Sequence, residues 1–423
     1  MISQYPFKAI CIYIAASLFL CYEMTLQVSP GVMAEDLMKS FSIGAGKLGL
    51  MASFYYYTYA LMQIPAGLLH DRFGPRRLIT FSALVCALGA FFFGSTLTVT
   101  NAALGRLLMG AGSAFAFIGV IVLTSRWIHK SHFALFVGFG QFLAAVGALG
   151  GKLPLAYFID HYNWRLIMLA LALIGIIIAA LILITIRDYP PEVVPHHKQD
   201  EIRLLLKLKE ILTHKETYTI GAFAFFTWAP VIAMAALWGV PYLMELYATS
   251  NTQAALAISM LWIGVAVASP FWGWFSDHLG KRVMPLQLGA SIGLISSLCL
   301  VYWPALPFSI FCIILFFFGF AGAVQVVTFA LIRENNRPSM VGAAVGLNNM
   351  AVVAGGAIFQ PLIGYILYVF WNGEFLQGLP HYTASNYHGA LTIIPISFII
   401  ALIISLYCIR ETNCHFRFDK RRK

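Results

Sequence analysis

Long apolar runs separated by short polar segments dominate this sequence. Crossing the hydrocarbon core of a bilayer as an α-helix takes about 20 mostly apolar residues, and at that length the sequence predicts about twelve spanning helices. The pattern therefore predicts an all-α integral membrane protein with six helices in each half of the chain. The first six cover roughly residues 7–33, 44–69, 78–97, 100–125, 132–157 and 163–187. The second six cover roughly residues 217–247, 252–275, 284–303, 306–332, 339–371 and 386–410.

One long polar segment separates the two sets of helices. It begins as DYPPEVVPHHKQDE and continues as IRLLLKLKEIL, whose apolar residues share one helical face. This composition predicts a linker that ends in an amphipathic helix lying on the membrane surface. We therefore expect an N-terminal bundle over 1–187, a cytoplasmic linker over 188–216, a C-terminal bundle over 217–412 and a basic cytoplasmic tail over 413–423.

Composition and charge agree with this arrangement. Of 423 residues, 60% are hydrophobic and 10% are charged, whereas soluble domains carry about 25% charged residues. With the N-terminus inside, only Lys39, Lys47 and Arg165 fall in outer loops, and most other Lys and Arg fall in inner loops. Because cytoplasmic loops carry the excess of Lys and Arg, both termini should be cytoplasmic. The net charge of +10 then reflects the placement of Lys and Arg in cytoplasmic loops. We expect the lipid bilayer to be a partner and expect no binding to nucleic acid.

The sequence shows no sign of enzyme chemistry. Its seven cysteines have no metal-ligand spacing and lie mostly in apolar runs, so we interpret them as small buried hydrophobic residues. The motifs H-E-x-x-H and G-x-x-x-x-G-K-[ST] are absent. We therefore expect no catalytic residue, no metal and no cofactor, and no ATP-driven transport within this chain.

An internal repeat relates the two halves. The loop after the second expected helix reads GLLHDRFGPRR, from Gly67 to Arg77, and the loop after the eighth reads GWFSDHLGKR, from Gly273 to Arg282. A duplication of six helices around a central cytoplasmic segment is typical of secondary transporters.

GLLHDRFGPRR resembles the signature loop of the major facilitator superfamily, G-x-L-x-D-R-x-G-x-[RK]-[RK], and GRLLMGAGSAF (Gly105 to Phe115) is similar to its R-x-x-x-G-x-G-x-x pattern. The resemblance covers nearly the whole chain and implies the major facilitator fold, two pseudo-symmetric six-helix bundles. VSPGVMAEDLMKSF and FYYYTYALMQIPAGLLHDRFGPRRL look like the Pht-type phagosomal transporters of intracellular bacteria. That group is associated with uptake of amino acids and nucleosides across the inner membrane, while related-looking permeases carry siderophores.

The resemblance also implies a gating latch at the cytoplasmic face. Asp71 should accept hydrogen bonds at the start of the eleventh helix, near residues 339–342, where the helix dipole favours a carboxylate. Asp277 should make the equivalent contact with the start of the fifth helix. Replacing Asp71 by Asn is then expected to lower transport without abolishing membrane insertion. The residues assigned to the latch are Gly67, Asp71, Arg72, Gly74, Arg76, Arg77, Asp277, Lys281 and Arg282.

Three charged residues lie inside expected spans: Glu23, Arg106 and Lys152. Facing lipid, each would cost about 2.5–3.5 kcal/mol or more, and their positions place all three in the outer half of the membrane. They form either one neutralising cluster that tightens the first bundle or a functional site. In the functional interpretation Glu23 is a proton-coupling carboxylate and the two cations favour an anionic substrate group. Lys152 either faces the cavity or extends to the surface.

Other polar and aromatic residues in the spans are candidates for lining a substrate cavity. They are Gln27, Tyr55, Tyr59, Gln63, Trp228, Trp238, Gln325, Asn348, Asn349 and Gln360. Tyr55, Tyr59 and Gln63 recur at the spacing of one helical face. Pro230 and Pro241 are expected to bend the seventh helix.

These features favour a secondary active transporter. We expect proton-coupled uptake of a small polar solute by alternating access, the solute being an amino acid, a nucleoside or another carboxylate-bearing metabolite. The alternatives are a siderophore or organic-anion permease, a proton-coupled exporter, or a membrane sensor that does not transport. The fifth span reads GALGGKLPLAY instead of the G-P-x-x-G-G pattern of exporters of the superfamily, which favours symport. The expected partners are a small-molecule substrate, protons and lipid, with the protein as a monomer.

Overall fold

The computed structural model describes residues 7–128, 133–190, 215–303, 306–336, 341–376 and 378–415. For a few residues within helices, among them Gly67 and Asp71, it describes the backbone alone. The amphipathic helix expected in the linker and most of the basic tail lie outside the described residues.

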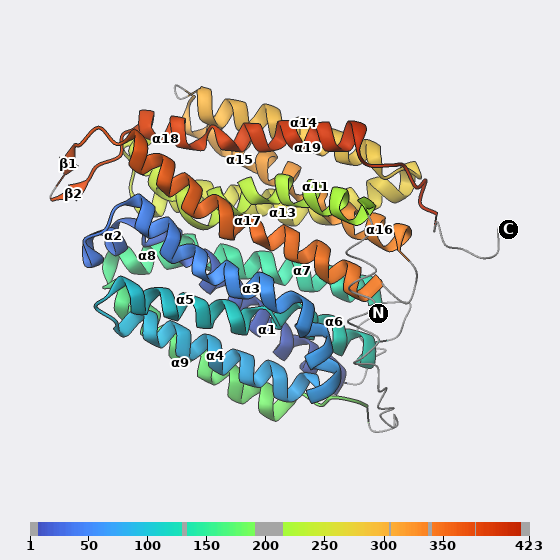
Figure 1. Ribbon diagram of the computed structural model, residues 1–423. Helices are drawn as coiled ribbons and strands as arrows, with labels where there is room; N and C mark the ends of the chain where they lie inside the picture. Colours follow the sequence, from blue (N-terminus) through green and yellow to red (C-terminus); the bar gives the residue numbers. More distant parts are fainter. Residues whose placement is uncertain are drawn as a thin grey trace. The chain divides into compact units, whose positions relative to one another are not determined.

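Contacts between Cα atoms divide the chain into two compact units. The first comprises residues 1–43 and 50–198, and the second comprises residues 44–49 and 199–423. The described parts are almost entirely helical (Figure 1).

The first unit contains six long apolar helices, several of them interrupted. Its elements are α1 (Phe7–Val28), the 3-10 turn η2 (Ser29–Val32), α2 (Ala34–Phe41), α3 (Ala45–Phe73, most of which belongs here), α4 (Pro75–Ser95), α5 (Val99–Ser113), α6 (Ala116–Trp127), α7 (Phe133–Gly150), α8 (Leu153–His161) and α9 (Trp164–Thr185). Inside this unit α4 packs against α5 and α9, and α1 packs against α7 (Figure 1).

The second unit repeats this arrangement. Its elements are α11 (Lys215–Ala233), the π-helical turn η4 (Met234–Trp238), α12 (Gly239–Tyr247), α13 (Asn251–Leu279), α14 (Val283–Tyr302), α15 (Phe308–Gly322), η5 (Ala323–Gln325), α16 (Val326–Asn335), α17 (Val341–Phe370), the strands β1 (Phe375–Leu376) and β2 (Leu379–Pro380), α18 (Ala384–Leu391) and α19 (Ile393–Tyr407). Here α14 packs against α15 and α19, and α11 packs against α17. These are the contacts of the first unit, transposed by six spans.

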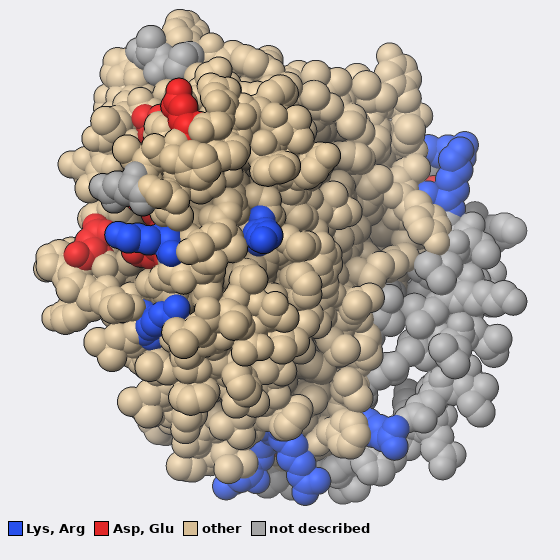
Figure 2. All heavy atoms as spheres, turned by 60° about the vertical axis from the view of Figure 1, so that its left-hand side comes forward, with Lys and Arg blue, Asp and Glu red and all other residues tan. Residues whose placement is uncertain are grey.

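The described segments include 11 helices long and apolar enough to cross a membrane. The remaining expected span, 44–69, corresponds to α3, a helix of 29 residues. Figure 2 shows that uncharged residues make up most of the surface drawn, with Lys, Arg, Asp and Glu in separate small groups. The sequence did not predict the small antiparallel hairpin of β1 and β2, in which Phe375 pairs with Pro380.

Candidate functional site

The carboxylate of Glu23 is buried in the first unit, with 1% of the residue exposed. Tyr55 on α3 donates a hydrogen bond of 2.8 Å to Glu23 Oε2. Glu23 Oε1 has no hydrogen-bond partner among the described residues, and Glu23 forms no ion pair with any of them. The carboxylate is therefore held by one phenol and is not paired with Arg106 or Lys152.

Arg106, on α5, is fully buried and directs its guanidinium to main-chain oxygens. It donates to the carbonyls of Leu26 at 2.8 Å and Gln27 at 3.3 Å, both near the end of α1. Its Cζ also lies 4.6 Å from the centre of the Tyr55 ring, within the range of a cation–π interaction. Tyr55 thus contacts both the acid and the guanidinium.

The end of α1 explains why carbonyls are available there. A helical carbonyl normally accepts from the N–H four residues later, but for Leu26 that residue is Pro30, which has no N–H. The α-helix ends at Val28 and continues as the 3-10 turn η2, so its last carbonyls need other donors. Cations suit this position because the helix dipole is negative at its C-terminus.

Lys152 also donates a hydrogen bond to the C-terminal end of α1. Its Nζ donates to the carbonyl of Val28 at 2.8 Å, and none of the residue is exposed. The side chain therefore points into the bundle and does not extend to the surface. The three ionisable groups meet along residues 23–28 of α1, but the structure places both cations on carbonyls and the carboxylate on a tyrosine.

Glycines in the fifth span bring Lys152 to α1. A Cβ added at Gly147 would lie 2.3 Å from the carbonyl oxygen of Cys21, and one at Gly151 would lie 2.6 Å from the side chain of Val28. Thr25 Oγ1 donates to the Gly147 carbonyl at 2.8 Å. Only glycine allows this close contact between the fifth span and α1.

The other first-unit candidates also lie in the interior. Tyr55 and Tyr59 stack with ring centres 5.8 Å apart, as the spacing of one helical face predicts. Tyr59, Gln63 and Gln27 are buried, with 7%, 3% and 5% exposed.

The second-unit candidates form a set of polar contacts between helices. Asn348 on α17 donates to Thr328 on α16 at 3.0 Å, and Trp238 donates to the carbonyl of Gln360 at 3.0 Å. Trp228 packs edge-to-face on Trp262 with ring centres 6.4 Å apart. The polar atoms left without a hydrogen bond among the described residues include Trp262 Nε1, Gln325 Oε1, Asn348 Oδ1 and Gln360 Oε1.

Sequence reasoning missed Trp262 and Thr328, since neither stands out from its apolar surroundings. Asn349, which it named, lies beside Asn348 on α17 and is partly buried.

The seventh span departs from regular α-helix in the predicted region. Pro230 lies inside α11, the π-helical turn η4 follows it, and Pro241 lies in α12. Because Pro230 has no N–H, the carbonyl of Phe226 loses its helical donor. Ser397 Oγ on α19 replaces that donor at 2.8 Å.

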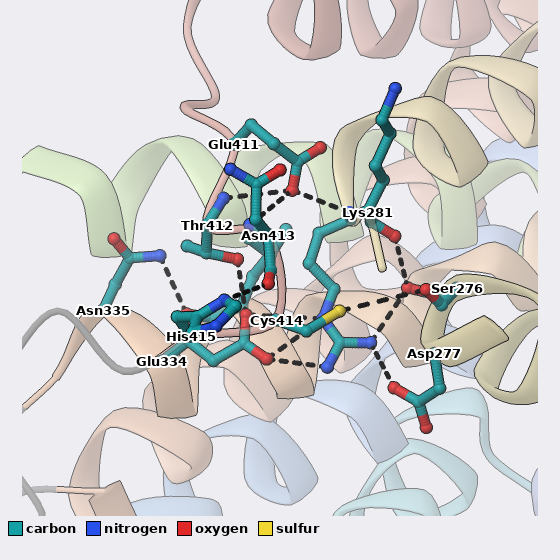
Figure 3. Close-up of polar contacts among 12 residues, drawn as sticks. Ser276, Asp277, Lys281, Glu334, Asn335, Glu411, Thr412, Asn413, Cys414 and His415 are labelled. Carbon is teal, nitrogen blue, oxygen red and sulfur yellow. Dashed lines mark hydrogen bonds and ion pairs between the residues drawn. The ribbon is translucent and has the colours of Figure 1, made fainter. Parts of the chain in front are cut away.

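At the end of α13 the second repeat loop forms a network of charged residues (Figure 3). Arg282 donates to Asp277 at 2.6 Å, to Glu334 at 2.6 Å and to Ser276 at 2.9 Å. Burial alone would lower the pKa of the Arg282 guanidinium, but the hydrogen bonds to Glu334 and Asp277 outweigh burial and raise that pKa above its ordinary value. The contact of Asp277 seen here is therefore within its own loop.

In the first repeat loop, the main-chain N–H of Arg76 donates to Asp188, and the Arg76 side chain donates to the carbonyl of Leu183 at 2.7 Å. Gly74 adopts a left-handed φ of 77°, as a turn before a helix requires. Arg72 and Arg77 are exposed, and so is Lys281 in the second loop.

The latch itself stays a prediction. The side chain of Asp71 and residues 337–340 lie outside the described parts of the chain, as do residues 129–132 at the start of the fifth span.

Repeated six-helix bundles with buried ionisable side chains define a polytopic membrane protein of the transporter class. The family model described as the Major Facilitator Superfamily matches residues 15–240 and 231–413 of this chain. This chain is a member of the Major Facilitator Superfamily, and the predicted fold of twelve spanning helices in two bundles is confirmed.

Named relatives and solved structures agree with this assignment. The chain is 24% identical over 375 residues to a probable hexose phosphate transport protein of Chlamydia trachomatis, covering 80% of this chain and 81% of that protein. It is 22% identical over 363 residues to the hexuronate transporter of Bacillus subtilis, covering 79% and 82%. The crystal structure of a bacterial homolog of the human lysosomal transporter Spinster, in an inward-facing, unoccupied conformation, superimposes with a TM-score of 0.77 at 16% identity, covering 95% and 96%.

Proposed function

We propose that this protein takes up a small hydroxylated organic anion across the bacterial inner membrane by alternating access, together with a proton. The observation that carries the proposal is Glu23, a buried carboxylate with a single phenol donor and no ion pair among the described residues. An ionisable group at such a position in a spanning helix is a functional candidate by default. Glu23 is the proton-binding residue in this proposal.

The charges around α1 support linkage between the proton and an anion. With Glu23 ionised, Glu23, Arg106 and Lys152 carry a net charge of +1, and protonation of Glu23 raises that charge by one unit. A more positive site binds an anion more tightly. By reciprocity, the anion favours protonation of Glu23, and this mutual preference is what symport requires.

The proposed substrate class rests on the same cations and on the relatives. The relatives are named for hexose phosphate and hexuronate, which are hydroxylated and anionic. A carboxylate-bearing metabolite fits the second of these names and the sequence-based expectation, and a hexose phosphate carries its negative charge on phosphate instead. Both termini are proposed to face the cytoplasm, since the Lys and Arg distribution favours that orientation, and a single chain is proposed as the working unit.

A proteoliposome assay tests the proposal. Reconstituted protein is given an inward proton gradient and a panel of hexose phosphates, hexuronates, amino acids, nucleosides and ferric siderophores. We expect gradient-dependent accumulation of an anionic sugar derivative, and its loss in Glu23→Gln. Glu374→Gln, which changes an exposed carboxylate, serves as the matched control. Accumulation that ignores the gradient, or survives unchanged in Glu23→Gln, contradicts the coupling mechanism.

A further inference from the structure

Tyr55 lies between Glu23, the proposed proton-binding residue, and Arg106, one of the cations proposed to favour an anionic substrate. Its hydroxyl donates to Glu23 at 2.8 Å, and the face of its ring lies 4.6 Å from the Arg106 guanidinium carbon. Tyr55 and Arg106 are fully buried and Glu23 is 1% exposed. Among the described residues no ion pair joins Glu23 to Arg106, and Tyr55 contacts both.

The Tyr55 side chain can transmit a change in the protonation of Glu23 to the guanidinium of Arg106. A phenol that donates to a carboxylate becomes more electron-rich, since hydrogen bonds polarise their neighbours. An electron-rich ring holds a cation over its face more strongly. A protonated carboxyl can instead donate its own proton to the phenol oxygen, and the ring's hold on the guanidinium weakens.

Building on the proposed function, we propose that Tyr55 is the positioning residue through which protonation of Glu23 releases Arg106 for an anionic substrate. Arg106 Nε has no hydrogen-bond partner among the described residues, so one donor is already available to an anion. With Glu23 ionised, Tyr55 keeps the guanidinium over its ring and on the α1 carbonyls. With Glu23 protonated, that hold loosens and the substrate anion competes for the guanidinium.

Other titratable groups lie near Glu23. In the described part of the chain, Tyr55 and Tyr59 on α3, Cys86 on α4 and Cys21 on α1 interact with it electrostatically. Arg106 and Lys152 contact the same stretch of α1 through its carbonyls. Phenols and thiols ordinarily titrate above neutral pH, so these four groups stay neutral as the solution is acidified from neutral pH.

Infrared titration of the full-length protein tests the first half of this link without any substrate. The carboxylic C=O band of protonated Glu23 is identified by its absence in Glu23→Gln. Tyr55→Phe removes the hydroxyl and keeps the ring over Arg106, and we expect it to move the midpoint of that band upward by about one to two pH units. Tyr13→Phe is the matched control, because Tyr13 is a buried tyrosine on α1 whose hydroxyl donates to a carbonyl, that of Phe136, at 2.7 Å.

Anion binding tests the second half. A hexuronate is the probe, since its carboxylate stays ionised from pH 5 to pH 8. We expect wild type to bind it at least tenfold more tightly at pH 5 than at pH 8, and Tyr55→Phe and Glu23→Gln to lose most of that dependence. An unmoved infrared midpoint in Tyr55→Phe overturns the proposal, as does wild-type pH dependence of binding in that variant. If neither wild type nor any variant binds the hexuronate, the proposed substrate class is wrong. The infrared result then still decides whether Tyr55 responds to protonation of Glu23.

Discussion

The main-chain N–H groups of Arg76 and Arg282, at equivalent positions of the two repeat loops, each donate at 2.8 Å to a carboxylate that follows the last helix of the same unit. Asp188 is the acceptor in the first unit and Glu411 in the second. A helix N-terminus presents unsatisfied N–H groups and the positive end of the dipole. The internal repeat therefore extends from the loop motifs to the acids that cap α4 and α14.

The Glu411 cap makes stability depend on pH. Its carboxylate accepts from the N–H groups of Arg282, Val283, Thr412 and Asn413 at 2.8 to 3.0 Å. Burial alone would raise the pKa of Glu411, but these donors outweigh burial and lower that pKa beneath its ordinary value. The stabilisation is therefore complete above the unfolded-state pKa and is lost as the pH falls through the lower folded-state pKa.

We therefore expect Glu411→Gln to lower the free energy of unfolding by about 1 kcal/mol at pH 7 and to flatten its decline in acid. Thermal unfolding in detergent from pH 7 to pH 3 measures both effects. Glu374→Gln, at an exposed carboxylate, is the control. A variant whose unfolding follows the wild-type pH curve would show that Glu411 does not cap α14.

The buried pair of Arg282 and Glu334 gives a larger effect. The two residues are 7% and 4% exposed and their side chains are 2.6 Å apart. Removing one partner leaves a buried charge, which typically costs 3–5 kcal/mol, so Arg282→Met should lose about that much unfolding free energy. Asp277→Asn removes the exposed partner of the same guanidinium and should cost about 1 kcal/mol or less. Equal losses in the two variants would contradict this ranking.

Hydropathy predicted the helices well because it measures the part of the chain that faces lipid. The first expected span, 7–33, matches α1 and η2 together, and the sixth, 163–187, matches α9 (Trp164–Thr185). It was less accurate where a helix continues beyond the bilayer. α13 runs to Leu279, four residues beyond its expected end, since the backbone hydrogen bonds continue through the polar residues of the loop motif.

The candidate site was predicted in its residues but not in its pairings. An acid in an apolar run marked Glu23, yet helix spacing relates side chains on one helix and says nothing about the rotation of α3 against α1. The contact of Arg106 with the Leu26 carbonyl was indicated in the sequence only by Pro30, which is a weaker signal. Pro30 withholds an N–H from the Leu26 carbonyl, and a carbonyl left bare inside a membrane needs a donor.

Gly110 fixes the helix that carries Tyr55. A Cβ added at Gly110 would lie 1.9 Å from the carbonyl oxygen of Tyr55 and 2.6 Å from Thr58 Oγ1. Gly110→Ala should therefore push α3 and α5 apart, cost about 1–3 kcal/mol and slow transport. At Gly221 on α11 the added carbon meets only Ala351, at 3.5 Å, so Gly221→Ala should be tolerated. Detergent melting and the proteoliposome assay compare the two, and wild-type behaviour of Gly110→Ala would refute the tight contact.

Ser397 and Pro230 should be energetically coupled although they do not bond to each other. Ser397 donates to the Phe226 carbonyl only because Pro230 cannot, so Ser397→Ala should cost about 0.5–2 kcal/mol in wild type. Pro230→Ala restores an N–H four residues after Phe226, and in that background the same serine change should cost little. A double-mutant cycle on unfolding free energies gives the coupling. Because Pro230 precedes the π-helical turn of the seventh span, Pro230→Ala should also slow transport. A serine cost that is equal in both backgrounds would mean that Ser397 acts in some other way.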